Sequence, residues 1–233
     1  MVSKINKIFD LLDDWRNIPN YQLERRADIF FSIYLHDVIE KKTKIPIHPI
    51  LIPEFPINIK TLFPEINTNK SYKIDYVLFS KDVTTAIFVE LKTDMSSIRE
   101  KQNNYIENAL NTNFSKLING LIDIFIATTS KEKYFNLFKK LSDIGIINLP
   151  STLHLKILSS NLQEINKEIS KIEIVKTIEQ NKFYYLRPNT ASEKTITFSE
   201  FISMIDDNDD ELTKRFIVSL NKWAKKKAGH RGI

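Results

Sequence analysis

Cysteine is absent from the sequence, so the chain can form no disulfide bond and offers no thiolate as a nucleophile or metal ligand. The four glycines build no phosphate-binding loop, and the four histidines lack metal-ligand spacing. No apolar run approaches the roughly 20 residues of a membrane-spanning helix. These absences predict a protein without a membrane partner, and the lack of cysteine fits a reducing, cytoplasmic location.

The composition is that of a globular chain with a sizeable core. Hydrophobic residues make up 42% and charged residues 27% of the 233 residues, which is ordinary for a folded domain. The formal net charge of +5 permits a polyanionic partner, but abundant lysine, isoleucine and asparagine are typical of AT-rich genomes, so the charge receives little weight. Without internal repeats or a long linker, the chain is predicted to form a single domain over residues 1–233.

Hydrophobic periodicity predicts seven helices, the last of them following an acidic run: 3–16, 21–40, 96–110 (with a capping box at Ser97–Glu100), 133–141, 161–168, 198–205 and about 211–227. Predicted strands are 74–79, 85–92, 121–127, 153–158, 172–175 and 183–186, preceded by a first strand within either 47–52 or 57–62. The order helix, strand, strand, strand, helix, strand predicts an α/β fold in three layers, with helices on both faces of a mixed sheet. This core covers about residues 21–128, and residues 129–233 are predicted to add further α and β elements.

Two β-prone apolar runs around residues 71–92 carry charged residues within them. If residues 81–84 form a four-residue hairpin loop, Asp75 lies directly opposite Glu90, with β-carbons about 5 Å apart. Because side chains alternate along a strand, Lys92 shares the face of Glu90. Charges inside such strands cost free energy unless they are paired or bind a metal. The pattern therefore predicts a site where these three residues converge, and a one-residue slip in register would remove Asp75 from it.

Two carboxylates beside a lysine are suited to metal-assisted hydrolysis of a phosphodiester bond. Asp75 and Glu90 would bind one or two Mg²⁺ ions, which prefer oxygen ligands, and the backbone carbonyl of Leu91 would add another oxygen. Mn²⁺ would serve in the same place. Lys92 would position or deprotonate the attacking water and neutralise charge on the phosphate.

The same strand residues also have a plain structural interpretation. Asp75 would pair with Lys73 or Lys92, and Glu90 would form a surface salt bridge with Lys92 on an edge strand. Against this, the surrounding residues are strongly apolar, which gives little sign of a solvated edge. The site interpretation is therefore favoured over the structural one.

Three polar residues on the predicted helices leave two interpretations open. Glu24 and Asp28 lie near the start of the helix over 21–40, where acids favour a helix N-terminus even when they are only solvated. Gln102 lies on the apolar face of the helix over 96–110. It is either a buried amide bonded to the backbone or a side chain aimed at the active site or at a phosphate.

In this pattern the chain resembles the PD-(D/E)xK nuclease superfamily, whose restriction-endonuclease-like fold has an α-β-β-β-α-β core. Asp75 matches the acid on the second strand of that core, with Ile74 standing where the family name has proline. Glu90-Leu91-Lys92 matches the (D/E)xK motif on the third strand. The resemblance covers about residues 21–128, whereas the remaining residues match no family pattern.

The resemblance implies further site residues on helices. Many members of the superfamily carry a glutamate on the first core helix, for which Glu24 is the best match and Asp28 the second. RecB-like members add a glutamine and a tyrosine after the lysine. Gln102 and Tyr105 resemble that pair, at a spacing one residue shorter than the usual pattern.

The sequence thus predicts a Mg²⁺- or Mn²⁺-dependent nuclease that acts on nucleic acid, with DNA the expected substrate. The predicted catalytic residues are Asp75, Glu90, Lys92, Glu24 and Gln102, and the predicted metal ligands are Asp75, Glu90 and Leu91. The alternatives are a catalytically inactive module of the same fold that binds nucleic acid without cutting it, and a protein-interaction module. The choice between DNA and RNA and the oligomeric state, a homodimer included, stay open.

Overall fold

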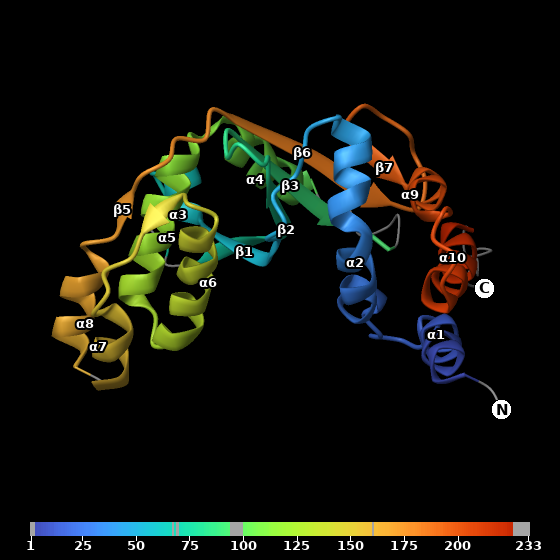
Figure 1. Cartoon of the computed structure of the whole chain (residues 1–233), viewed down its shortest axis with the longest axis horizontal. Helices are drawn as coiled ribbons and strands as arrows, with labels where there is room; N and C mark the ends of the chain where they lie inside the picture. Colours follow the sequence, from blue (N-terminus) through green and yellow to red (C-terminus); the bar gives the residue numbers. More distant parts are fainter. Residues whose placement is uncertain (1–2, 67, 69, 94–99, 160, 226–233) are drawn as a thin grey trace. The chain divides into compact units, whose positions relative to one another are not determined.

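The computed structural model describes residues 3–66, 68, 70–93, 100–159 and 161–225, and Figure 1 shows the elements in chain order by colour. The helices are α1 (Lys4–Trp15), α2 (Leu23–Thr43), α3 (Ile59–Leu62), α4 (Glu100–Asn111), α5 (Phe114–Ala127), α6 (Lys131–Asp143), α7 (Leu153–Ser159), α8 (Leu162–Ile169), α9 (Phe198–Ile205) and α10 (Glu211–Ala224). The strands are β1 (Ile52–Asn58), β2 (Ser71–Phe79), β3 (Thr85–Leu91), β4 (Ile147–Asn148), β5 (Glu173–Ile174), β6 (Gln180–Arg187) and β7 (Thr195–Thr197).

The described residues form an α/β fold around a five-stranded sheet with the order β1-β2-β3-β6-β7. The sheet is mixed, because β1, β2 and β3 pair in antiparallel fashion whereas β6 and β7 run parallel. The predicted α/β class with a mixed sheet is therefore confirmed. Strands β4 and β5 form a separate two-stranded sheet. Within the described part of the chain, no helix is both long enough and apolar enough to cross a membrane.

The β2–β3 hairpin has the register that its loop length predicts. The backbone N–H of Ser80 donates to the carbonyl of Thr85 at 2.9 Å, which leaves residues 81–84 as the loop. Tyr76 lies opposite Val89, and the pairing continues without a slip towards the loop. Strand β3 lies between β2 and β6 and is buried along its whole length. The hairpin therefore places the predicted (D/E)xK motif at the end of a rigid, interior strand.

The strand predicted over 121–127 is wrong, because these residues form the second half of helix α5. Asn113 caps this helix by accepting a hydrogen bond from the backbone N–H of Ser115 at 2.9 Å. The buried side chains of α5 follow the 3.6-residue period of a helix: Phe114, Leu117, Ile118, Leu121 and Phe125. The 3.6-residue period can be recognised only when the residues are counted from the N-cap of α5, Asn113. Seven apolar residues taken alone fit a buried strand equally well.

Other boundaries also differ from the prediction. Strand β1 spans Ile52–Asn58, between the two predicted windows, and the sheet tolerates Pro53 and Pro56 there because β1 is an edge strand. The strand predicted over 153–158 is wrong, since these residues form helix α7, with Leu153 and Ile157 buried one turn apart. The predicted helix start near residue 96 and its capping box lie outside the described residues.

The chain divides into two compact units, each built from separated segments. The first unit contains the described residues within Met1–Ile45, Glu90–Ile98 and Tyr184–Ile233. The second contains those within Pro46–Val89 and Arg99–Phe183. The strands β3 and β6 thus contribute residues to both units, and the (D/E)xK segment itself belongs to the first.

An aromatic cluster forms the core of the first unit. The ring of Phe31 on α2 lies 5.5 Å from Phe198 and 5.4 Å from Phe201 of α9, measured between centroids. Phe216 of α10 lies 5.1 Å from the same ring, and Trp223 lies 6.5 Å from it. All five rings are fully buried. Helix α2, whose first turn carries Glu24, is therefore held firmly against α9 and α10.

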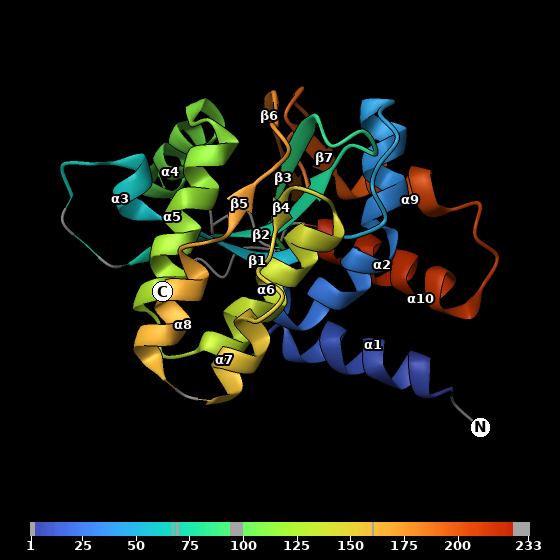
Figure 2. The same ribbon diagram turned by 60° about the vertical axis from the view of Figure 1, so that its left-hand side comes forward.

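Asp13 attaches helix α1 to helix α10, which lie side by side in Figures 1 and 2. Its carboxylate accepts hydrogen bonds from Lys222 Nζ at 2.7 Å, Trp223 Nε1 at 2.8 Å and Arg215 Nη2 at 3.1 Å. Burial alone raises the pKa of Asp13, but these donors and Ser219 outweigh it and hold the pKa below its ordinary value. The ionised carboxylate therefore contributes to the stability of the first unit.

We expect acidification to weaken this attachment. A carboxylate with a depressed folded-state pKa stabilises the fold above its unfolded-state pKa, and that stabilisation is lost as pH falls through the folded-state value. Asp13→Asn should be less stable than the unaltered protein at neutral pH, by about 1–3 kcal/mol, and the difference should shrink at acid pH. Urea unfolding of both proteins across a pH series measures it. Asp14→Asn, which alters the exposed neighbour, is the control; a gap that does not change with pH would contradict this role for Asp13.

Candidate active site

Glu90 and Lys92 are buried charges at the end of the interior strand β3. Glu90 is 3% exposed and Lys92, one residue beyond the strand, is 5% exposed. The backbone N–H of Lys92 donates to the carbonyl of Leu186 on β6 at 2.8 Å, which fixes the main chain at this point. Two charged residues at these positions would be costly without partners, so their contacts decide what the segment can do.

Lys92 is the centre of a cluster of three charges in the first unit. Its Nζ lies 2.9 Å from Oε1 of Glu90 and 3.6 Å from Oε1 of Glu24. Glu24 comes from the first turn of α2, and its side chain is 31% exposed, so the cluster opens to solvent on that side. The structure thus brings together three of the five predicted catalytic residues, Glu24 being one that only the family resemblance had implied.

The alternative of a surface salt bridge on an edge strand is wrong. Both side chains of the Glu90–Lys92 pair are almost fully buried, and β3 has a neighbour on each side. The cost of desolvating such a pair is often as large as its Coulombic gain, so a buried ion pair is weak evidence of a role in stability alone.

Asp75 lies on strand β2 of the second unit. The described ladder ends where Tyr76 faces Val89, and Asp75 and Glu90 are the next residues on the two strands. The predicted register thus holds up to this step, and the meeting of the two carboxylates stays a prediction. Lys73, a suggested partner of Asp75, forms an ion pair with Glu54 of β1 at 3.2 Å.

Gln102 lies on α4 in the second unit, where its Nε2 donates to the hydroxyl of Tyr72 at 3.2 Å. The ring of Tyr72 also stacks on Tyr105, with centroids 5.2 Å apart. Because Tyr72 and Asp75 are three residues apart on β2, strand alternation places them on opposite faces of the sheet. This hydrogen bond therefore does not bring Gln102 to Asp75, and a catalytic role for Gln102 stays a prediction.

The donor set of the cluster fits a hard divalent cation. Two carboxylates, from Glu24 and Glu90, share one ammonium, so the three side chains carry a net negative charge. Carboxylate oxygens, together with the backbone carbonyl of Leu91, are the ligands that Mg²⁺ prefers. Among the residues that the structure describes, no three histidine or acidic side chains are already gathered as a metal site.

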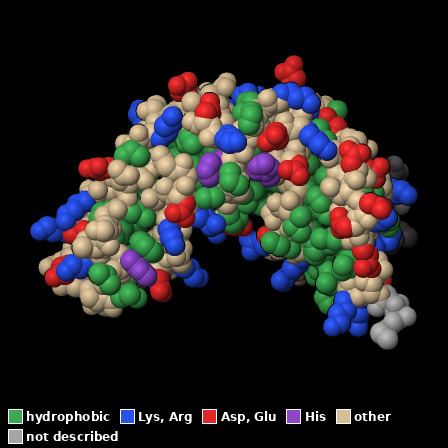
Figure 3. All heavy atoms as spheres, viewed as in Figure 1, with side chains coloured by type: hydrophobic (Ala, Val, Ile, Leu, Met, Phe, Trp, Pro, Cys, Tyr) green, Lys and Arg blue, Asp and Glu red, His purple; other side chains and the backbone are tan. Residues whose placement is uncertain are grey.

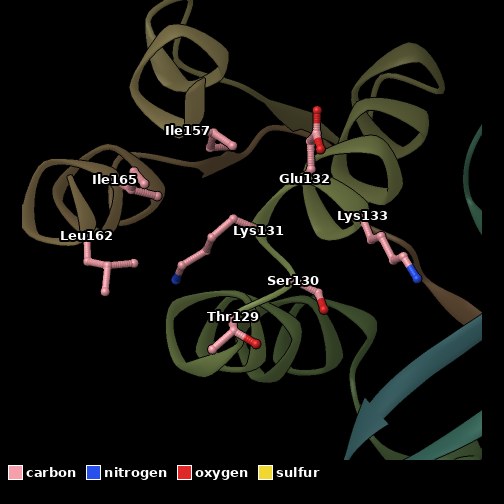
Figure 4. Close-up of a pocket in the computed structure, with 8 residues that line it drawn as sticks. All are labelled: Thr129, Ser130, Lys131, Glu132, Lys133, Ile157, Leu162 and Ile165. Atoms are coloured by element: carbon pink, nitrogen blue, oxygen red, sulfur yellow. The ribbon is translucent and has the colours of Figure 1, made fainter. Parts of the chain in front are cut away.

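A cavity of about 550 Å³ in the second unit lies beside another buried lysine, Lys131 (Figure 4). The three protons of its ammonium are donated to the carbonyls of Phe125 and Ile126 and to Oδ1 of Asn166, at 2.7 to 2.9 Å. Burial lowers the pKa of Lys131. Because these carbonyls end helix α5 and Asn166 belongs to α8, Lys131 connects two helices, and we assign it a structural role.

Arg187, a neighbour of the cluster, is not among the site residues that the sequence predicts. It ends strand β6, next to the residue whose carbonyl binds the N–H of Lys92. No local pattern marks it, because the pairing of β6 with β3 joins segments far apart in the chain.

Comparison of the chain with models of known protein families, with curated proteins and with solved structures finds no match. Function must therefore be inferred from the residues themselves.

Proposed function

We propose that this protein is a metal-dependent nuclease of the PD-(D/E)xK type, which hydrolyses phosphodiester bonds of DNA. The observation that carries the proposal is the buried Glu90–Lys92 pair at the end of an interior strand, with Glu24 of the first long helix at the same ammonium. A carboxylate and a lysine two residues on are the (D/E)xK part of the superfamily motif, and many members add a glutamate on the first core helix. A cytoplasmic location belongs to the same proposal.

In this proposal the fourth strand of the restriction-endonuclease-like core is β6, in place of the strand that residues 121–127 fail to form. It neighbours β3 in the sheet, as the strand after the (D/E)xK motif should. Helix α2 then serves as the first core helix and α4 as the helix that follows the motif. Helices α5 to α8 become an insertion between α4 and the last strand.

The roles of the side chains follow from their positions. Asp75, Glu90 and the carbonyl of Leu91 would hold Mg²⁺ or Mn²⁺, with Glu24 as a further acid. A bound ion supplies Lewis-acid chemistry, in that it activates water and stabilises negative charge on the phosphate. The carboxylate of Glu90 holds Lys92 in one orientation, and the ammonium of Lys92 would orient the attacking water and offset charge on the phosphate oxygens.

The face of the molecule in Figure 3 gives no reason to favour DNA through charge alone. Lysine and arginine side chains are interspersed there with aspartate and glutamate over both units, so the net charge of +5 does not collect in one basic patch on this face. Substrate binding through this face would therefore depend on contacts near the site more than on a broad basic patch. DNA as substrate and a homodimeric state both remain parts of the proposal.

Cleavage assays on the purified full chain test the proposal. Supercoiled plasmid, linear duplex, branched and single-stranded DNA, and RNA, would each be incubated with Mg²⁺, Mn²⁺, Ca²⁺ or EDTA. We expect cleavage of DNA with Mg²⁺ or Mn²⁺, and none with EDTA. No cleavage of any of these substrates under any metal condition would overturn the nuclease proposal.

A nucleic-acid-binding module without catalysis is the second candidate. It is favoured by the fact that Lys92 already contacts both Glu24 and Glu90, which gives a cluster with partners inside the protein. Such a module should bind nucleic acid with an affinity that falls steeply as salt is raised, and it should bind equally well with EDTA. Cleavage that depends on Glu90 would exclude it.

A further inference from the structure

Arg187 lies on the strand next to the Glu90–Lys92 pair. Strands β3 and β6 run in the same direction, because the N–H of Gln180 bonds the carbonyl of Thr84 near their starts and the N–H of Lys92 bonds the carbonyl of Leu186 near their ends. In a parallel ladder the latter bond pairs Leu91 with Leu186. Arg187 is then the neighbour of Lys92.

The same pairing decides the face of the sheet on which Arg187 lies. Alternation places Arg187 on the face of Lys92 and Glu90, and it places Tyr185 there as well. Two contacts agree with this: the guanidinium carbon of Arg187 lies 5.4 Å from the ring centroid of Tyr185, and its Nη2 donates to Oγ1 of Thr195, which pairs with Tyr185. Arg187 therefore belongs to the face that carries the candidate active site.

In the guanidinium of Arg187, Nη2 donates hydrogen bonds to neighbouring residues, whereas Nε has no hydrogen-bond partner in the described part of the chain. Nη2 donates to the carbonyl of Thr190 at 3.1 Å and to Oγ1 of Thr195 at 3.0 Å. Nε is buried and has no hydrogen-bond partner among the residues that the structure describes. Both protons of Nη2 are used and Nε is closed to solvent, so Nη1, which donates to no residue that the structure describes, is the nitrogen open to an anionic acceptor.

We infer that Arg187 binds a non-bridging oxygen of the phosphodiester that the Glu90–Lys92 site would cleave, which makes it a further catalytic residue. This inference rests on the proposed nuclease function. The acids of the cluster are already engaged by Lys92, whereas Nη1 of Arg187 donates to none of the residues that the structure describes. A guanidinium N–H fits a phosphate oxygen because the hydrogen bond between a permanent cation and an anion is charge-assisted and strong.

Arg187→Lys and Arg187→Gln test the inference. Lysine keeps the charge but loses the planar edge, and glutamine loses the charge. We expect kcat/KM on a DNA substrate with Mg²⁺ to fall about 10²–10³-fold for Arg187→Gln, as when one transition-state donor is removed, and less for Arg187→Lys. Arg26→Lys, at an exposed arginine of α2 in the same unit, is the matched control and should stay within about twofold. Equal activity of all four proteins would overturn the inference.

A sulfur-substituted substrate separates phosphate contact from a structural role. DNA in which a single non-bridging oxygen of each phosphate is sulfur should be cleaved more slowly by the unaltered protein, because sulfur is a poorer hydrogen-bond acceptor. If Arg187 donates to that oxygen, Arg187→Gln should show a much smaller sulfur effect than the unaltered protein. Replacing Mg²⁺ by Mn²⁺ should not change this difference between the two proteins. A sulfur effect of the same size in the variant, for either stereoisomer, would mean that Arg187 acts only through the fold.

Binding measurements keep the inference testable apart from nuclease function. Fluorescence anisotropy of a labelled oligonucleotide would be recorded with Ca²⁺ and with EDTA, for the unaltered protein and for Arg187→Gln. If no protein cleaves but Arg187→Gln binds about tenfold more weakly, the nuclease proposal fails and the phosphate contact stands. If the unaltered protein cleaves while Arg187→Gln matches it in binding and in cleavage, the nuclease proposal stands and the inference fails.

Discussion

Replacing Lys92 by methionine should lower the rate of metal-dependent DNA cleavage by about 10²–10⁴-fold, the range expected when a proton-transfer or charge-stabilising group is lost. Methionine fills a similar volume without a charge, so it keeps the packing around β3. The loss should appear mainly in kcat, because the proposed role of Lys92 is at the reacting phosphate and its side chain is buried. Single-turnover cleavage with Mg²⁺ measures the effect.

Lys131→Met is the matched control for this experiment. Lys131 is also almost fully buried, at 6% exposure, but among the described residues its ammonium donates to two backbone carbonyls and an amide and to no carboxylate. Its loss should lower the stability of the second unit and leave the cleavage rate of the folded protein unchanged. A Lys92→Met variant that is folded and cleaves at the unaltered rate would remove Lys92 from the mechanism.

The second prediction with a large effect concerns the free energy of unfolding of variants at Glu90 and Lys92, and it separates stability from cleavage activity. Glu90→Leu and Lys92→Met should each lower the free energy of unfolding by about 3–5 kcal/mol, because each removes an ion-pair partner from a buried charge. The double variant should lie within about 1 kcal/mol of the unaltered protein, since two apolar side chains of similar size replace the pair. Glu90→Leu should be the milder single change, because Lys92 keeps Glu24 at 3.6 Å.

Urea unfolding of the four proteins gives the coupling energy of the pair directly. A restored double variant that still fails to cleave would show that the pair is retained for chemistry and adds little to stability. Single variants as stable as the unaltered protein would show that the two charges are solvated or otherwise paired. A restored double variant that cleaves normally would place the active site elsewhere.

Local sequence rules predicted the hairpin well because its determinants are local. The four-residue loop fixed the pairing of Ser80 with Thr85, and from there the register ran without a slip to Tyr76 and Val89. The amphipathic periods of α2 and α10 likewise predicted those helices. In each case the information lies within one turn or one loop of the residue concerned.

The wrong predictions concern short apolar runs whose secondary structure was predicted without the residues on either side of them. Residues 121–127 and 153–158 are helical, and the cap at Asn113 and the burial of Leu153 and Ile157 one turn apart show why. Periods of two and of 3.6 residues cannot be told apart over six or seven apolar residues. The last core strand was consequently assigned to 121–127, whereas β6 occupies the place beside β3.

The sequence by itself determined that Glu90 and Lys92 share one face of a strand, because alternation of side chains is a property of the backbone. Only the tertiary structure decided that this face is buried, that Glu24 reaches the same ammonium, and that Arg187 lies on the neighbouring strand beside Lys92. Those contacts join segments far apart in the chain. They depend on how apolar faces pack and which strands pair, and no local period encodes that choice.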